Sequence, residues 1–227
     1  MEHRLILDAV RRNGLQLADA DRKFQADSEI VLAAVQQNGV ALQYASNELR
    51  SNKQIVLAAV SQDGSALADV FETSGLDDDT DVCIAAVQQA PWALQYCSER
   101  LKRCPQVVGT AVSIDAFALQ YAIGDVLKSR QIIEKAIHNN GWAALCYADA
   151  TIQGNEELVR QAIAQNSLAL GAASDELRAD KALVLYALDK APHGLALMYA
   201  DENLRDDKEV GDPNFTLPTS ATSSHLS

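Results

Sequence analysis

The sequence predicts an all-α solenoid, or superhelix, of about eight short αα-hairpin repeats with a period near 25 residues. Three observations predict it: a leucine recurs at nearly constant spacing, the segments around it resemble one another, and each copy divides into two apolar pieces. Successive leucines lie 25, 25, 27, 25, 26, 25 and 27 residues apart. The eight leucines are Leu17, Leu42, Leu67, Leu94, Leu119, Leu145, Leu170 and Leu197.

The similarity between copies extends over whole segments. Residues 30–45 read IVLAAVQQNGVALQYA, residues 55–70 read IVLAAVSQDGSALADV and residues 82–97 read VCIAAVQQAPWALQYC. Units of this kind stack so that each contacts its neighbours. We therefore expect one α-helical repeat domain over residues 1–210, with eight hairpins and the start of a ninth. The Ser-, Thr- and Pro-rich residues 211–227 are expected to be disordered.

The first piece of each copy is expected to be a short inner helix. Asp27 and Ser28 precede the apolar residues 30–35, and both residue types favour a helix N-cap. Asn38 and Gly39 follow, and they suit a helix C-terminus that needs a left-handed residue. Pro91 marks the same turn in another copy, because proline cannot continue a helix.

The second piece is expected to be an amphipathic outer helix of about ten residues. Ala41, Leu42, Ala45 and Leu49 lie at i, i+1, i+4 and i+8, which is one stripe of a 3.6-residue period. Helices this short are marginal alone, so their stability must come from stacking on neighbours. The small alanines allow neighbouring backbones to approach closely.

Composition excludes several classes of partner. The net charge of −12 disfavours nucleic acid, whose phosphates need Lys and Arg, and it also disfavours anionic membrane surfaces. The first apolar run is broken at Asp8, so no signal-peptide core is predicted, and no segment has the length of a membrane helix. We expect an intracellular, cytoplasmic protein. Cys83, Cys97 and Cys146 replace small or apolar residues of other copies, which predicts buried free thiols.

Departures from the repeat are where function is sought. The acidic residues 75–81 lack the spacing and the closing Glu of a calcium loop, so they are interpreted as a linker whose last acids cap the next helix. His138 and His193 are near turns of separate copies, without a carboxylate or cysteine in ligand spacing. No metal and no cofactor are predicted.

The candidate interaction residues fall into two groups. Trp92 and Trp142 share the position after the turn, where equal positions in different copies would line one surface; packing between repeats is the alternative explanation. Arg100, Lys102 and Arg103 form a compact basic cluster, which would contact an acidic partner or balance charge at a helix C-terminus. The last full hairpin is a further candidate, for self-association.

The repeat resembles a known family. The period V-L-A-A-V-x-x-N-G-x-A-L-x-Y-A-S-x-x-L-R-x-D-K, closest at residues 31–53 and 168–208, resembles the helical repeat named domain of unknown function 4116 (DUF4116). The resemblance covers about residues 1–210 and departs at residues 71–81, at residues 99–106 and after Val210. It implies a repeat module of intracellular proteins and supplies no catalytic residues.

The function predicted is a non-catalytic protein–protein interaction or scaffold module, and not an enzyme. The sequence has no phosphate-binding loop, no H-E-x-x-H and no nucleophile elbow. The protein partner is expected to carry positive charge, given the acidic balance. One alternative is an enzyme or regulatory subunit with a site assembled across repeats, and a weaker one is RNA reading by helical repeats.

Overall fold

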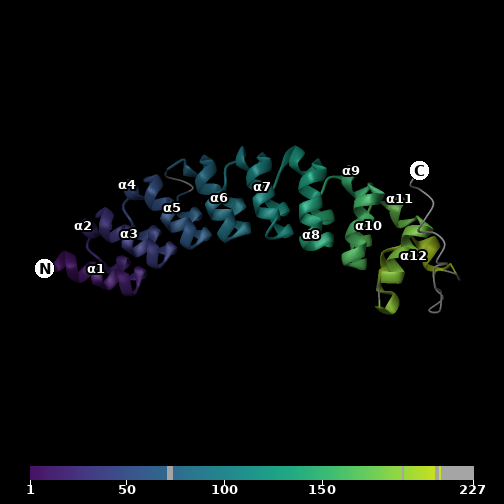
Figure 1. Ribbon diagram of the computed structural model, residues 1–227, viewed down its shortest axis with the longest axis horizontal. Coiled ribbons are helices and arrows are strands. Elements are labelled where there is room, and N and C mark those ends of the chain that lie inside the picture. The colour runs from purple at the N-terminus through teal and green to yellow at the C-terminus, as the bar shows by residue number, and fades with distance from the viewer. Residues whose placement is uncertain (71–73, 191, 208–209, 211–227) are drawn as a thin grey trace. The chain divides into compact units, whose positions relative to one another are not determined.

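The computed structural model describes residues 1–70, 74–190, 192–207 and 210, and the predicted disordered tail lies outside them. The chain divides into two compact units, residues 1–126 and 127–227, which are described separately. All regular elements of the described residues are helices, as the sequence predicts (Figure 1).

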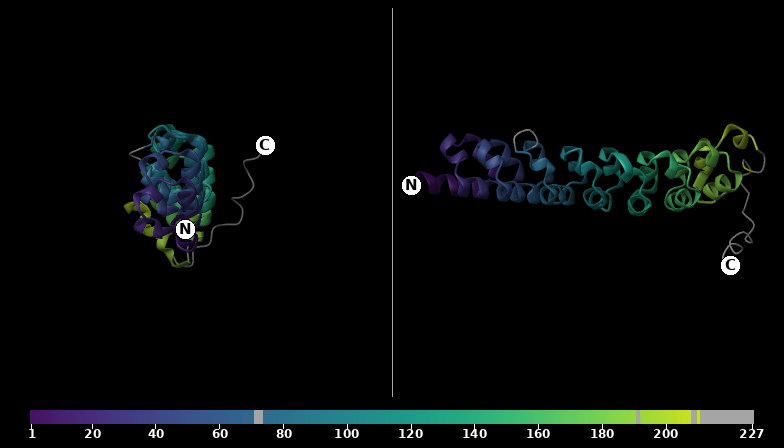
Figure 2. Two further views of the ribbon diagram at one scale, coloured as in Figure 1. Left: turned by 90° about the vertical axis from the view of Figure 1, so that its left-hand side faces the viewer. Right: turned by 90° about the horizontal axis from the view of Figure 1, so that it is seen from above.

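In unit 1, five α-helices follow one another along the chain, each in contact with the next (Figures 1 and 2). These inner helices are α1 (Glu2–Arg12), α3 (Ser28–Gln37), α5 (Lys53–Gln62), α6 (Thr80–Gln89) and α7 (Pro105–Val112). Their counterparts in unit 2 are α8 (Arg130–Tyr147), α10 (Glu156–Gln165) and α12 (Lys181–Lys190).

The second piece of each repeat differs from the expected ten-residue helix. Gly39–Tyr44 forms a 3₁₀-helix, η2, after which Ala45 is extended (φ −69°, ψ 156°) and a one-turn α-helix, α4, covers Asn47–Arg50. The four apolar residues predicted to share a stripe are nevertheless all buried, at 0 to 8% exposure. The break at Ala45 therefore changes the direction of the chain, and the same four residues still face the core.

The same division recurs in the other repeats. The remaining 3₁₀-helices of this kind are η1 (Gly14–Asp19), η3 (Gly64–Asp69), η5 (Pro91–Tyr96), η7 (Ala116–Tyr121), η9 (Ser167–Ala172) and η10 (Pro192–Tyr199). The short elements that close the repeats are α2 (Arg22–Gln25), η6 (Leu101–Arg103), η8 (Gly124–Lys128), α9 (Ala150–Gln153), α11 (Asp175–Arg178) and α13 (Glu202–Arg205). An additional 3₁₀ turn, η4 (Leu76–Asp78), lies in the lengthened acidic link.

Helix α8 shows how the array accepts an extra residue. It contains a kink at Asn140 (φ −157°, ψ 98°), which is the residue equivalent to Asn38. After the kink, seven residues replace the usual six. Six residues make two turns of 3₁₀-helix, and seven make about two turns of α-helix. The leucine within the segment therefore points in the same direction in both forms. Leu145 is accordingly buried, like Leu42.

The inner helices begin as predicted and end differently. The Asp27 side chain accepts hydrogen bonds from the backbone N–H groups of Glu29 (3.0 Å) and Ile30 (3.1 Å). At the other end Asn38 is extended (φ −150°, ψ 111°), and its side chain accepts from Val40 N (3.1 Å). The prediction of a left-handed residue at this turn is wrong, because the described glycines with positive φ are Gly75 and Gly124.

Gly39 is required by packing between repeats. A Cβ on Gly39 would lie 2.4 Å from the Ala59 carbonyl oxygen of the next inner helix. The Gly39 N–H also donates to the side-chain oxygen of Gln62, and the equivalent Gly14 N–H donates to Gln37 (2.5 Å). At Gly39 this approach of the neighbouring repeat leaves no room for a Cβ.

The recurring leucines form the centre of each repeat. Seven of them, from Leu17 to Leu170, are at most 1% exposed, and Leu197 of the last described repeat is half-buried. A backbone hydrogen bond also recurs between successive closing elements: Ser46 N donates to Gln25 O (2.8 Å), and Ser174 N donates to Gln153 O (2.9 Å). Neighbouring repeats are thus joined by core packing on one side and by main-chain bonding on the other.

Candidate protein-interaction surface

One position is exposed or half-buried in successive repeats: the second residue of each of the 3₁₀-helices that follow the inner helices. In unit 1 it holds Leu15, Val40, Ser65, Trp92 and Phe117. We call the apolar members, Leu15, Val40, Trp92 and Phe117, the apolar stripe. The equivalent position in unit 2 holds Trp142 after the kink of α8 and Leu168 in η9.

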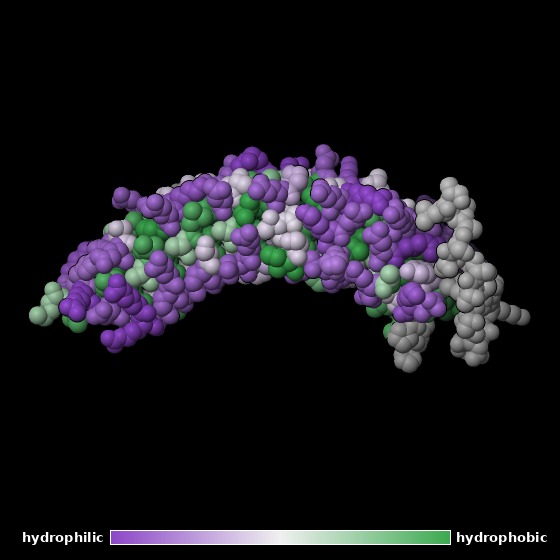
Figure 3. Space-filling view, in the orientation of Figure 1, coloured by the Kyte–Doolittle hydropathy of each residue, from purple (hydrophilic) through white to green (hydrophobic). Residues whose placement is uncertain are grey.

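The position accounts for much of the exposed apolar surface. Trp92 is 42% exposed, Leu15 39%, Phe117 37% and, in unit 2, Trp142 36%. The other large hydrophobic side chains that are exposed among the described residues are Met1, Leu5, Ile114, Leu195 and Met198. On the face shown in Figure 3, the apolar surface is broken into separate patches among hydrophilic residues. A position that is apolar in several repeats therefore differs from the rest of the surface.

The local backbone explains why these side chains share a direction. The residue before each 3₁₀-helix is extended, with φ between −150° and −139° in unit 1. Where this residue is Asn or Asp, its side chain accepts from the stripe residue's N–H, as Asn13 does from Leu15 (3.1 Å) and Asp115 from Phe117 (2.9 Å). Ala90, which precedes η5, makes no such bond. Because successive 3₁₀-helices of unit 1 also contact one another, the stripe residues fall on one side of the stack.

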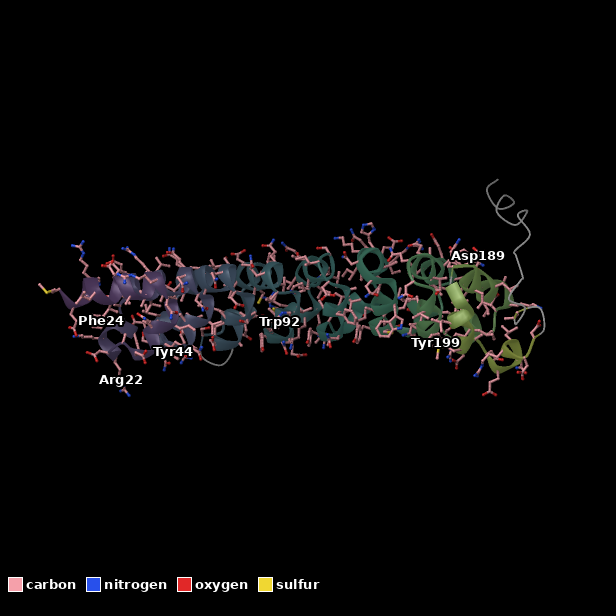
Figure 4. The ribbon with its side chains drawn as sticks, turned by 90° about the horizontal axis from the view of Figure 1, so that it is seen from below. Arg22, Phe24, Tyr44, Trp92, Asp189 and Tyr199 are labelled. Carbon is pink, nitrogen blue, oxygen red and sulfur yellow. The ribbon has the colours of Figure 1, made fainter. Side chains whose placement is uncertain are left out.

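Trp92 lies at the most aromatic part of the stripe. The Trp92 side chain is labelled in Figure 4. Its ring meets the Tyr96 ring edge to face, with centroids 6.1 Å apart, and both residues belong to η5. Pro91 precedes Trp92 where the first three repeats carry glycine, and proline has no N–H to donate. The following repeat carries Ile114, 49% exposed, at the position where Gln37 accepts from Gly14. A polar bond is thereby replaced by further apolar surface beside Trp92.

The basic cluster has partners within unit 1. Arg100 donates to the Asp78 carboxylate (2.9 Å) and to the Asp78 carbonyl oxygen (2.6 Å). Lys102 lies 3.8 Å from Glu99, and Arg103 lies so close to Gly124 that a Cβ there would be 2.8 Å from its guanidinium nitrogen. Arg100 and Lys102 therefore balance local carboxylates; contact of the cluster with an acidic partner stays a prediction.

The acidic link also has defined partners. Asp79 caps α6 by accepting from Asp81 N (3.0 Å) and Val82 N (3.2 Å), which confirms the expected capping role. Lys53 of the preceding repeat contacts the carboxylates of Asp79 and Asp81, each at 2.8 Å. No group of three or more His, Cys, Asp or Glu gathers in the geometry of a metal site within the described part of the chain.

Asp78 gives a testable pH dependence. The Ser98 hydroxyl, and then Arg100, hold the pKa of Asp78 below its ordinary value. A carboxyl with a lowered pKa in the folded state stabilises the fold above its unfolded pKa, and this contribution is lost as pH falls through the folded pKa. Asp78→Asn should therefore unfold at lower denaturant concentration than wild type at pH 7, and the difference should shrink as pH falls through the lowered pKa of Asp78. A difference that persists unchanged in acid would contradict this role.

The chain was compared with known families and proteins. It matches the family described as "Domain of unknown function (DUF4116)" over residues 4–50, 27–72, 79–126 and 129–178. The chain belongs to this family. The first two matches share residues 27–50, which is one repeat, and the third ends at the boundary between the two units. No curated protein and no solved structure matches the chain.

The cysteines of this DUF4116 chain are only partly as predicted. Cys83 and Cys97 are buried free thiols. A hydrogen bond with Cys97 and burial raise the pKa of Cys83, which keeps that thiol protonated and unreactive at neutral pH. The prediction for Cys146 is wrong, because Cys146 is exposed. The extra residue of α8 places it at the outward position that Gln43 holds in η2.

Other described polar features of the DUF4116 repeats lie on the surface or pair with one another. His138 is exposed on α8, and the His193 side chain lies outside those described. A cleft of about 320 Å³ in unit 2 is lined by Asp175, Arg178, Ala200, Asp201, Glu202 and Arg205. Its arginines pair with its own carboxylates, Arg178 with Asp175 and Arg205 with Glu202 (3.6 Å). No described helix has the length and apolar character needed to cross a membrane.

Sequence reasoning identified the tryptophans and missed the rest of the stripe. Leu15 and Phe117 occupy the same position as Trp92, and counting two residues from each turn residue would have found them. Their exposure was not predictable in that way, because it depends on what the neighbouring repeat covers.

Proposed function

We propose that the chain is a non-catalytic interaction module that binds an extended segment of a partner protein along the apolar stripe of unit 1. The observation that carries the proposal is the exposure of Trp92 and Phe117 at the same position of adjacent repeats. Aromatic residues in apolar patches provide most of the binding energy at many protein interfaces. The proposed setting is intracellular, where buried free thiols such as Cys83 and Cys97 persist.

The spacing of the repeats favours an extended partner. Packed helices lie about 8–10 Å apart, so stripe residues of adjacent repeats are separated by a similar distance. Three residues of a polyproline-type extended chain advance about 9.3 Å. Four residues of an α-helix advance only about 6 Å. A peptide with an apolar residue at every third position therefore matches Trp92 and Phe117 in register.

Charge adds a second requirement on the partner. Residues 1–126 contain 10 Lys and Arg against 17 Asp and Glu, a net charge of −7. A negative surface attracts a basic segment, chiefly by raising the association rate at low salt. The proposed partner sequence has apolar residues three apart, with Lys or Arg among them.

The proposal is tested by selecting binders from a random peptide library displayed on phage. Selected peptides should share apolar residues at i and i+3, and the Trp92→Ala/Phe117→Ala variant should bind them at least about 30-fold more weakly. Leu5→Ser is the matched control, because Leu5 is 64% exposed on α1, off the stripe, and its loss should leave binding unchanged. Peptides that bind both variants as tightly as wild type would refute the stripe as the site.

A further inference from the structure

Glutamine follows most residues of the apolar stripe at a fixed distance. Three of the four stripe residues, all except Leu15, are followed three positions later by a glutamine. In the repeat where Ser65 interrupts the stripe, the same position holds Ala68. An apolar residue and an amide therefore occur together in three repeats, including the adjacent pair that carries Trp92 and Phe117. We call Gln43, Gln95 and Gln120 the stripe glutamines.

The 3₁₀ conformation places each glutamine beside its stripe residue. A 3₁₀-helix has three residues per turn, so side chains at i and i+3 lie directly above one another. In all three repeats both residues lie within one such helix, η2, η5 or η7. Gln43 and Gln120 are exposed, and Gln95 is half-buried. Each of these repeats therefore presents an apolar side chain and an amide on the same outward face.

Two of the amides are oriented by bonds to their own helix. Gln43 Nε2 donates to the Val40 carbonyl oxygen at 3.1 Å, and Gln120 Nε2 donates to the Phe117 carbonyl oxygen at 3.1 Å. A glutamine amide has two N–H donors and one acceptor oxygen. The bond to the helix uses one N–H, so the second N–H and the oxygen remain for a partner.

Such amides suit the main chain of an extended partner. An extended chain of the polyproline type makes no internal hydrogen bonds, so its N–H and C=O groups are bonded to water. When apolar side chains of the partner pack on Trp92 and Phe117, part of that main chain loses its water, and an unpaired polar group costs free energy. An amide beside each apolar contact offers both a donor and an acceptor. A helical partner gains no such bond, because its main-chain groups already bond to one another.

We infer that the stripe glutamines hydrogen-bond the main chain of the extended partner, with one glutamine to every third partner residue. The inference rests on the proposed function, because it takes the apolar stripe as the binding site. Packed helices lie about 8–10 Å apart, and three residues of the extended chain advance about 9.3 Å. Gln95 and Gln120 therefore meet the main chain at the same interval at which Trp92 and Phe117 meet apolar side chains. The stripe sets the register of the partner, and the glutamines recognise its extended conformation.

Fluorescence anisotropy with a labelled peptide tests this role. The peptide has leucine at i and i+3 and only Ser and Lys elsewhere. Methionine matches glutamine in length and lacks the amide, so Gln95→Met/Gln120→Met removes the hydrogen bonds and keeps the apolar surface. This variant should bind the peptide at least about tenfold more weakly than wild type, and circular dichroism should show it folded. Gln54→Met is the matched control: Gln54 is exposed in the first turn of α5, at the end away from η3, and its replacement should leave binding unchanged.

Peptides with a main-chain ester test the bonded group itself. Replacing one amide of the peptide at a time by an ester removes one N–H donor and leaves every side chain in place. At least one ester between positions i and i+4 should weaken binding to wild type about fivefold and leave binding to Gln95→Met/Gln120→Met unchanged, which is the coupling of a double-mutant cycle. Equal losses for both proteins at every ester position would overturn the inference.

The outcomes distinguish this inference from the proposed function. If binding of the leucine peptide requires Trp92 and Phe117 but is unchanged in Gln95→Met/Gln120→Met, the stripe is the site and the role of the glutamines is wrong. If the peptide does not bind wild type, or binds Trp92→Ala/Phe117→Ala equally well, both proposals fail.

Discussion

Replacing Gly39 with alanine should lower the free energy of unfolding by about 3 kcal/mol, the upper end of the range for overpacked cores. The added Cβ would lie 2.4 Å from the Ala59 carbonyl oxygen and 3.0 Å from Asp63, both in the next repeat. Neither backbone can yield without separating two repeats, and that separation also weakens the bond from Gly39 N–H to Gln62. Urea denaturation monitored by circular dichroism measures the effect.

Gly154→Ala is the matched control for Gly39→Ala. The nearest atom to a Cβ at Gly154 lies 3.5 Å away, which is ordinary van der Waals contact. Alanine there should be neutral or stabilise the protein by up to about 1 kcal/mol, because it reduces the freedom of the unfolded chain. Equal destabilisation by both substitutions would show that close approach at Gly39 is not the cause.

Leu170→Ala should lower the free energy of unfolding by about 2–5 kcal/mol, the range for a buried leucine that leaves a cavity. Leu170 is fully buried in η9, at one of the eight recurring leucine positions. In a linear array each repeat contacts only its neighbours, so a cavity in one repeat weakens its coupling to both. Thermal or urea unfolding is again the measurement.

Leu168→Ala provides the comparison for Leu170→Ala within the same helix. Leu168 is half-buried at the outward position equivalent to Val40, so less apolar contact is lost. The cost should be clearly smaller than that of Leu170→Ala, by at least about 1 kcal/mol. Similar costs for both would contradict the assignment of Leu170 to the centre of the repeat.

The sequence predicted which residues face the core better than it predicted the helix type. Ala41, Leu42, Ala45 and Leu49 are buried as expected, yet the helix drawn through them is broken at the extended Ala45. A segment of six residues makes two turns of 3₁₀-helix or less than two turns of α-helix. Over so short a length, the spacing of apolar residues does not distinguish the two helix types. The repeat period was recoverable because it recurs eight times along the chain.

The turn glycine shows a second limit of prediction from sequence. A left-handed backbone at Gly39 would be a local requirement, and local requirements can be predicted from neighbouring residues. Its actual role is contact with the Ala59 carbonyl, two helices away in the chain. The candidate site divides in the same way: the shared position of Trp92 and Trp142 follows from the sequence, and the exposure of each depends on the neighbouring repeats.

The proposed interaction along the apolar stripe is tested most directly by the spacing of the partner's apolar residues. Two peptides of identical composition, with two apolar residues at i and i+3 or at i and i+4, would be titrated against the full chain by fluorescence anisotropy. The repeat spacing predicts that the first peptide binds at least about tenfold more tightly, and that Trp92→Ala/Phe117→Ala removes the difference. Equal or tighter binding of the second peptide would contradict an extended partner lying along adjacent repeats.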